Sequence, residues 1–224
     1  MRIKSIVLIL VATLFLQACS SAKVVSAWKG EQENIDKFRE KNILVIARTA
    51  NDHARIAFEE AIKLQLEAKG LKATESFKKF PKINTDREIS EERLAMVKSI
   101  LDSEGYTGVV LTVVKDKEQT LQTTSNGVYV GASYGGYPGY YGGFNSYYAR
   151  PYAYGSYYNS FGGYIPTSTS TRTITDYVLE TVAYNLDEPT ENQLVAIVTT
   201  EVNDPKDAYK TADEYAYKIM KSLE

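Results

Sequence analysis

Two continuous runs of apolar, mostly β-branched residues place the tightest constraint on how this chain can fold. One is Ile43-Leu44-Val45-Ile46-Ala47, and the other extends from Val109 to Val114. Neither run shows the polar alternation of a strand that has one face in water. Each therefore predicts a strand in the middle of a sheet, with both faces covered.

Helical periodicity follows the first run. Apolar residues recur at helical spacing from Ala54 to Ala68, Asn51 or Asp52 can cap the start, and Gly70 supplies a left-handed end. The residues from Leu71 to Ser76 then read as a second strand. The first predicted helix therefore joins two strands.

A second helix is predicted before the run that ends at Val114. The Ser90 hydroxyl can cap its first turn, Glu91 and Glu92 suit its positive end, and Gly105 ends it. The predicted order of elements up to this point is βαβαβ.

The last part of the chain has antiparallel character. Two strands are predicted over 176–186 and 193–202, because the intervening 187–192 has the length and residues of a hairpin loop. A final helix is predicted to begin at Asp204-Pro205, with Asp as its cap. The predicted fold class is α/β (α+β): one domain with a mixed sheet and helices packed on it. The chain is long enough for one such core.

The first eighteen residues have the three parts of a secretory signal. Arg2 and Lys4 precede an apolar stretch over 6–16, which is too short to span a membrane, and Leu16-Gln17-Ala18-Cys19 follows. Those four residues resemble the lipobox of bacterial lipoproteins. The resemblance implies cleavage before Cys19 and a lipid on its sulfur. The alternative is an ordinary buried thiol.

With Cys19 as the first mature residue, acyl chains would hold the protein on a membrane. Ser20 stands where retention in the inner membrane would favour Asp, so we expect the outer membrane of the bacterial cell envelope, with the domain facing the periplasm. The predicted parts are a signal peptide over 1–18, an acylated tether over 19–41 and the α/β domain over 42–224. Cys19 is the only cysteine, so no internal disulfide can form.

A tyrosine- and glycine-rich insertion interrupts the domain over about 126–170. Twelve of the 18 tyrosines fall between Val128 and Tyr164, and between Gln119 and Thr175 only Arg150 and Arg172 carry charge. Regular core elements do not have this composition. One interpretation is a mobile, low-complexity loop.

The other interpretation of the insertion is an adhesive surface. Tyrosine offers a flat apolar ring and a hydroxyl at low entropy cost, which suits sugar rings, membrane interfaces or another copy of the chain. An arginine among tyrosines can add cation–π contacts. The residues predicted to contact a ligand or partner are Tyr137, Tyr140, Tyr141, Tyr147, Tyr148, Arg150 and Tyr152.

Charge and residue content argue against several functions. The net charge of −2 becomes −4 when Arg2 and Lys4 leave with the signal, and an acidic chain lacks the basic surface that nucleic acids need. The only histidine, His53, stands at a helix start, so neither a metal site nor a Ser-His-Asp triad is supported. Glu59-Glu60 and Glu91-Glu92 point about 100° apart on helices and read as solvated faces. We expect no enzyme and no cofactor.

Four stretches resemble a family of uncharacterised bacterial envelope lipoproteins. They are Ser26-Ala27-Trp28-Lys29, Ala54-Arg55-Ile56-Ala57-Phe58-Glu59, Tyr177-Val178-Leu179-Glu180-Thr181 with Tyr184-Asn185-Leu186, and Glu201-Val202-Asn203-Asp204-Pro205. Members often carry a Gly/Tyr-rich segment in the same place, and Leu-Val-Trp where this chain has Leu194-Val195-Ala196. The predicted order of strands and helices also resembles that of the curli-secretion lipoprotein, the TolB amino-terminal domain and the lipoprotein activator of penicillin-binding proteins. Neither resemblance implies catalytic residues.

These observations predict a non-enzymatic, membrane-anchored binding or assembly domain. Its insertion would contact an envelope protein or a cell-wall glycan. The alternative is an oligomeric structural or secretion-associated envelope subunit, which the curli-channel similarity would imply. A hydrolase is the third hypothesis and is disfavoured by the lack of a recognisable site.

Overall fold

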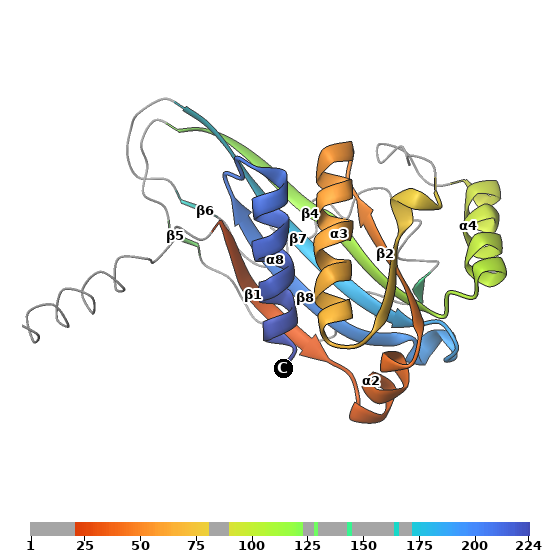
Figure 1. Cartoon of the computed structure of the whole chain (residues 1–224). Coiled ribbons are helices and arrows are strands. Elements are labelled where there is room, and N and C mark those ends of the chain that lie inside the picture. The colour runs from red at the N-terminus through yellow and green to blue at the C-terminus, as the bar shows by residue number, and fades with distance from the viewer. Residues whose placement is uncertain (1–20, 81–89, 123–127, 130–142, 145–163, 166–171) are drawn as a thin grey trace, which may run out of the picture.

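The computed structural model describes residues 21–80, 90–122, 128–129, 143–144, 164–165 and 172–224. These residues form a single mixed α/β domain around a six-stranded sheet with the order β1-β8-β7-β4-β2-β3 (Figure 1). The strands are β1 (Ala22–Lys29), β2 (Asn42–Arg48), β3 (Lys72–Glu75), β4 (Gly108–Gln122), β7 (Arg172–Asn185) and β8 (Leu194–Asn203). The predicted fold class is confirmed.

Helices pack on both faces of the sheet. The described α-helices are α2 (Gln32–Arg39), α3 (Asp52–Ala68), α4 (Glu91–Glu104) and α8 (Ala208–Ser222), with short 3₁₀ helices η1 (Ser76–Lys78) and η2 (Thr190–Asn192). Within the insertion, β5 (Val128–Tyr129) pairs antiparallel with β6 (Tyr164–Ile165).

The strand register confirms the predicted topology. Strand β2 lies inside the sheet and is parallel to both β3 and β4. Strand β7 is antiparallel to β4 from Asn185 opposite Gly108 to Arg172 opposite Gln122, and β8 is antiparallel to β7. The insertion therefore leaves and re-enters the sheet at the far end of the long β4–β7 ladder.

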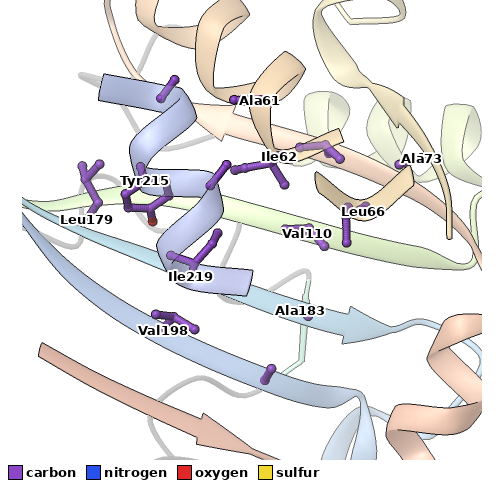
Figure 2. Packing of buried hydrophobic residues seen from close by; sticks show 14 of the residues in the cluster. Ala61, Ile62, Leu66, Ala73, Val110, Leu179, Ala183, Val198, Tyr215 and Ile219 are labelled. Atoms are coloured by element: carbon purple, nitrogen blue, oxygen red, sulfur yellow. The ribbon is translucent and has the colours of Figure 1, made fainter. Parts of the chain in front are cut away.

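Side chains of α3 and α8 cover one face of the sheet, the first face, and form the larger core (Figure 2). Ile62 of α3, and Tyr215 and Ile219 of α8, are buried there together with Val110 of β4. The Tyr215 hydroxyl shares a hydrogen bond of 2.7 Å with the Thr181 hydroxyl. Burial raises the pKa of Tyr215, so this phenol stays neutral and belongs to the packing.

The opposite, second face carries a smaller core. Val97 and Leu101 of α4 belong to one buried cluster with Leu44 of β2, Leu111 of β4 and Tyr184 of β7. Apolar residues of β2 and β4 thus contribute to both cores. This double coverage explains why their sequences are continuously apolar.

Most predicted helix ends are confirmed. The Asn51 side chain accepts a hydrogen bond from the Ala54 amide at 3.2 Å, which caps α3. The Ser90 hydroxyl accepts one from the Arg93 amide and caps α4, and Gly105 ends that helix with φ of +69°.

The start of the last helix was predicted three residues too early. Helix α8 begins at Ala208, and the Asp207 carboxylate caps it by accepting a hydrogen bond from the Lys210 amide at 2.9 Å. Asp204 instead follows the end of β8, where its amide donates to the Asp176 carboxylate at 2.9 Å. Its backbone has φ of +42°, which suits a turn and not a helix.

The tether predicted over 19–41 is wrong for most of its length. Residues 22–29 form β1, which pairs with β8 from Ala22 opposite Val202 to Lys29 opposite Ala196, and residues 32–39 form α2. Trp28 packs, partly buried, against the second core. The domain therefore includes residues 22–39 and does not begin at residue 42.

Candidate functional site

The residues predicted to act all lie outside the described part of the chain. They are Cys19 and, in the insertion, Tyr137, Tyr140, Tyr141, Tyr147, Tyr148, Arg150 and Tyr152. Described residues do border both segments. The site can therefore be built from the contacts that hold the chain next to Cys19 and inside the insertion.

The chain that follows Cys19 is tied to α8 at the beginning of β1. The Ser21 amide and hydroxyl donate to one carboxylate oxygen of Glu214 at 3.1 and 3.0 Å. Lys218 donates to the Ala22 carbonyl and pairs with Glu214 at 3.0 Å. The first residues of the domain are thus held at one defined place, where β1 meets α8.

Phe144 anchors the middle of the insertion in the second core. Its side chain is only 2% exposed and belongs to the cluster that includes Tyr184. The two rings meet edge to face, with centroids 6.0 Å apart and an interplanar angle of 67°. This geometry is favourable for aromatic pairs. At least this part of the insertion is not a free loop.

The backbone around Phe144 is held by the β7–β8 connection. Gln193 accepts a hydrogen bond from the Phe144 amide at 3.2 Å and donates one to the Glu188 carbonyl at 3.3 Å. Gly143 lies so close to Thr190 that an added Cβ would approach the Thr190 methyl to 2.4 Å. Glycine is therefore required for this close contact.

The residue type at position 144 could have predicted this buried anchor, although the overall composition of the insertion could not. Almost all aromatic residues of the insertion are tyrosines, whose hydroxyls need partners when buried, whereas Phe144 and Phe161 carry none. A phenylalanine among tyrosines thus marks a residue that can enter a core without leaving a polar group unsatisfied.

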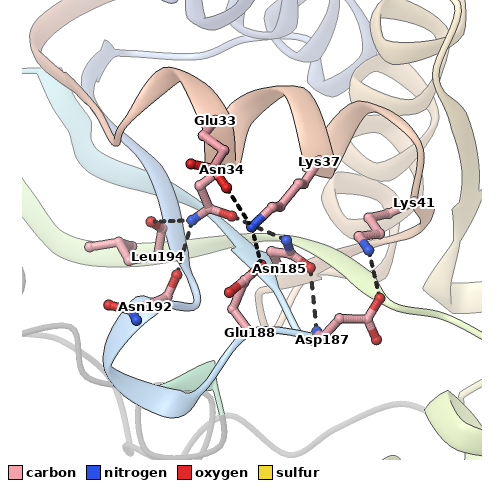
Figure 3. A network of polar contacts seen from close by, with 9 residues as sticks. All are labelled: Glu33, Asn34, Lys37, Lys41, Asn185, Asp187, Glu188, Asn192 and Leu194. Atoms are coloured by element: carbon pink, nitrogen blue, oxygen red, sulfur yellow. Dashed lines mark hydrogen bonds and ion pairs between the residues drawn. The ribbon is translucent and has the colours of Figure 1, made fainter.

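A polar network joins α2 to the β7–β8 connection (Figure 3). The Asn34 side-chain nitrogen donates to the Asn192 carbonyl at 2.9 Å, and the Asn185 side-chain nitrogen donates to the Asn34 side-chain oxygen at 3.1 Å. Lys37 pairs with Glu33 at 3.0 Å and with Glu188 at 3.2 Å. These two carboxylates raise the pKa of Lys37. The segment that supports Phe144 is therefore itself held in place.

The second face also buries a salt bridge. Lys115 Nζ lies 3.2 Å from Glu180 Oε1, and the two side chains are 3% and 0% exposed. Lys115 occupies a β-bulge between Val114 and Asp116. Buried pairs of this kind are costly to break, because the remaining charge is left without its partner in a dry site.

Carboxylates gather at the end of the second face from which the insertion emerges. Glu118 and Asp176 are direct cross-strand partners, and their pKa values are raised by burial and by neighbouring negative charges. Burial also raises the pKa values of Asp116 and Glu201. This end of the second face is therefore acidic.

A cleft of about 320 Å³ opens on the first face, between the N-terminal parts of α3 and α8. Its apolar lining includes Ala54 and Phe58 of α3, Leu179 of β7, Val202 of β8 and Ala208 of α8. Its polar lining residues include Asn51 and Thr112. No local sequence pattern predicts this cleft, because its walls come from segments more than 150 residues apart, such as Ala54 and Ala208.

The glutamate pair Glu59-Glu60 was predicted to be a solvated face, which is wrong for Glu59. That carboxylate is fully buried and accepts hydrogen bonds from the Ala47 amide at 3.0 Å, the Ser76 hydroxyl at 2.7 Å and the Phe77 amide at 2.7 Å. Arg55 donates to it at 3.1 Å. Through these hydrogen bonds, Glu59 links α3 to β2 and η1.

The described residues assemble no recognisable catalytic constellation. His53 is exposed in the first turn of α3, and Glu91 and Glu92 are exposed on α4. In the described ranges, no three His, Cys, Asp or Glu side chains are arranged to hold a metal ion. Among the helices of this part of the chain, none is long and apolar enough to cross a membrane.

No family model and no curated protein matches this chain. Among solved structures, it is similar to the PelC dodecamer from Paraburkholderia phytofirmans, with 10% sequence identity, a TM-score of 0.42 and coverage of 90% of this chain and 96% of that chain. A variant of that dodecamer with one leucine replaced by methionine gives 10% identity, a TM-score of 0.40 and coverage of 91% and 96%. TM-scores of this size support no functional argument.

Proposed function

We propose that this protein is a lipid-anchored, non-enzymatic binding or assembly domain of the bacterial envelope. A lipid on Cys19 would hold it on the outer membrane, facing the periplasm. The tyrosines of the insertion would contact an envelope protein or a cell-wall glycan. The anchoring of Phe144 carries this proposal.

The insertion is held at three places. It leaves the sheet at Gln122, re-enters at Arg172 and is pinned between them at Phe144, which contacts Tyr184. At about 3.4 Å per residue, Arg172 and Tyr184 lie about 40 Å apart along β7. The contact of Phe144 with the core restricts the conformations of the insertion before a partner binds. Less conformational entropy is then lost on binding, which favours higher affinity. Low-complexity composition is then compatible with a defined contact surface.

The proposal is tested by removing the tyrosines and keeping the anchor. We expect crosslinking in intact cells to attach partners to the wild-type protein, and these partners to be lost when the six tyrosines among the predicted contacts become serine. Those contacts are Tyr137, Tyr140, Tyr141, Tyr147, Tyr148 and Tyr152. Matched controls are Tyr209→Ser and Tyr217→Ser on α8, where the side chains are 51% and 54% exposed. An unchanged set of crosslinked partners in the six-residue variant would contradict the proposal.

The anchor is tested separately with Cys19→Ala. The variant is expected to remain unprocessed or to leave the membrane fraction, because neither lipid attachment nor cleavage before the cysteine can follow. Normal processing together with full membrane retention would refute the lipid anchor.

The edge of the sheet favours a second candidate, a self-assembling envelope subunit. Among the described strands, β1 pairs on one side only, with β8, and Val25 on it is 40% exposed. An unpaired strand edge can accept a strand from another copy. Light scattering of the protein in mild detergent should then give a discrete oligomer, and a monomer would exclude this candidate.

A further inference from the structure

The cleft between α3 and α8 has the size and lining of a ligand site that the proposed partner binding does not use. Its volume of about 320 Å³ lies in the range of small-molecule pockets. The walls are built from Ala54, Phe58, Leu179, Val202 and Ala208, so most of the surface offered to a ligand is apolar. An occupant therefore needs an apolar body.

The charged residues that line the cleft are all basic. Among the described residues that line it, the charged ones are Arg48 and Lys206, and no carboxylate lines it, although the chain carries a net charge of −2. Lys206 is 65% exposed at the rim and pairs with Asp204 outside the lining. An exposed lysine at the mouth of an apolar pocket complements an amphiphile with a negatively charged head.

The cleft also lies where the chain enters the domain. Val202 lines the cleft and is the direct strand partner of Ala22. Three residues of chain, from Cys19 to Ala22, span at most about 11 Å. If Cys19 carries a lipid, as the proposed function states, the cleft stands next to the bilayer surface.

We propose that this cleft binds one acyl chain of an anionic membrane phospholipid. The acyl chain lies against the apolar walls formed by α3, α8 and the sheet, and the phosphate group faces Lys206 at the rim. The position of the cleft next to the bilayer depends on the proposed lipid anchor at Cys19. The chemistry of the cleft does not, so it can be tested without the lipid on Cys19.

The test uses the mature chain, residues 19–224, carrying Cys19→Ser and measures its co-sedimentation with vesicles. We expect binding to phosphatidylcholine vesicles that contain phosphatidylglycerol, and little binding to phosphatidylcholine alone. Filling the cleft with Ala54→Leu and Ala208→Leu together should lower binding about tenfold, because the added side chains occupy the site of the acyl chain.

Charge reversal at the rim provides a variant that leaves the buried core unchanged, because Lys206 is exposed. Lys206→Glu should lower binding to the anionic vesicles about tenfold. Lys210→Glu is the matched control: it makes the same charge change on an exposed residue of α8 outside the lining, and it should bind within about twofold of the parent protein. Thermal unfolding verifies that every variant is folded.

Equal binding by the parent protein and both cleft variants would overturn the proposal, since the contact with vesicles would then lie elsewhere, for example in the insertion. Binding of monomeric dodecanoate without binding of anionic vesicles would also overturn it, by assigning the cleft to a soluble fatty acid. Neither outcome affects the proposed partner contact, because this assay contains no protein partner and no lipid on Cys19.

Discussion

Replacing Phe144 with alanine should detach the insertion from the second face while leaving the first core intact. The side chain is 2% exposed and meets Tyr184 edge to face. Truncation of a buried phenylalanine to alanine costs about 3–5 kcal/mol, which includes loss of apolar contact and the cavity that remains. We expect the insertion to undock without unfolding of the domain, and the docking equilibrium to weaken by about 3 kcal/mol, at the lower end of that range.

Limited proteolysis with chymotrypsin measures this equilibrium, because the protease cleaves after the many tyrosines of the insertion. When opening and closing are fast, the cleavage rate follows the population of the open state. A loss of 3 kcal/mol corresponds to about a 100-fold increase in that population. Phe144→Ala should therefore be cleaved within the insertion about 100 times faster than the wild-type chain.

Phe80→Ala is the matched control for that experiment. Phe80 is 5% exposed and belongs to the same buried cluster, but it follows η1 and lies outside the insertion. Its truncation should lower the free energy of unfolding in urea with a much smaller effect on cleavage of the insertion. Equal cleavage rates for Phe144→Ala and the wild-type chain would refute the argument that Phe144 holds the insertion in place.

Three further outcomes follow from contacts of the described residues. Glu59→Ala should lower the free energy of unfolding by about 3–5 kcal/mol in urea, because Arg55 is left buried without its partner, whereas Glu60→Ala should change it by less than about 1 kcal/mol. Gly143→Ala should increase chymotrypsin cleavage of the insertion, and Thr190→Ser should partly reverse the effect by removing the methyl group in the way. The pKa values of Glu118 and Asp176 are raised in the folded state, so ionisation of these two carboxyl groups lowers the stability of the domain as pH rises. The double variant Glu118→Gln with Asp176→Asn should therefore be more stable than the wild-type domain at about pH 7. It should show no gain below about pH 4, where both carboxyl groups are protonated in the folded and unfolded states.

The elements that could be predicted from sequence carry their information locally. The continuous apolar run of β2 needs no knowledge of its neighbours to be recognised as a buried strand, and the caps Asn51 and Ser90 act on amides three residues away. The same holds for the β7–β8 hairpin, whose strands are joined by a short loop. Periodicity, caps and turns were therefore sufficient for βαβαβ and for the antiparallel strands.

The features that were missed depend on distant partners. Strand β1 carries Lys23 and Lys29 among small and apolar residues, and it becomes a strand by pairing with β8, about 170 residues away. Helix α2 has little apolar surface beyond Ile35 and Phe38, and its Asn34 is held by the β7–β8 connection. In the sequence, Glu59 cannot be distinguished from a solvated glutamate, because its hydrogen-bond donors Ser76 and Phe77 belong to η1. No local pattern contains these contacts.

The corrected start of the domain also bears on how a lipid on Cys19 would orient it. A tether over 19–41 would leave all orientations open, whereas the short connection to Ala22 brings one end of the sheet to the bilayer. At that end the two faces differ in charge: the first face carries the cleft with Lys206, and the second carries Glu118 and Asp176. A membrane with anionic lipids attracts the first face and repels the second. The second face, to which Phe144 pins the insertion, would then turn away from the lipid, toward a partner in the periplasm.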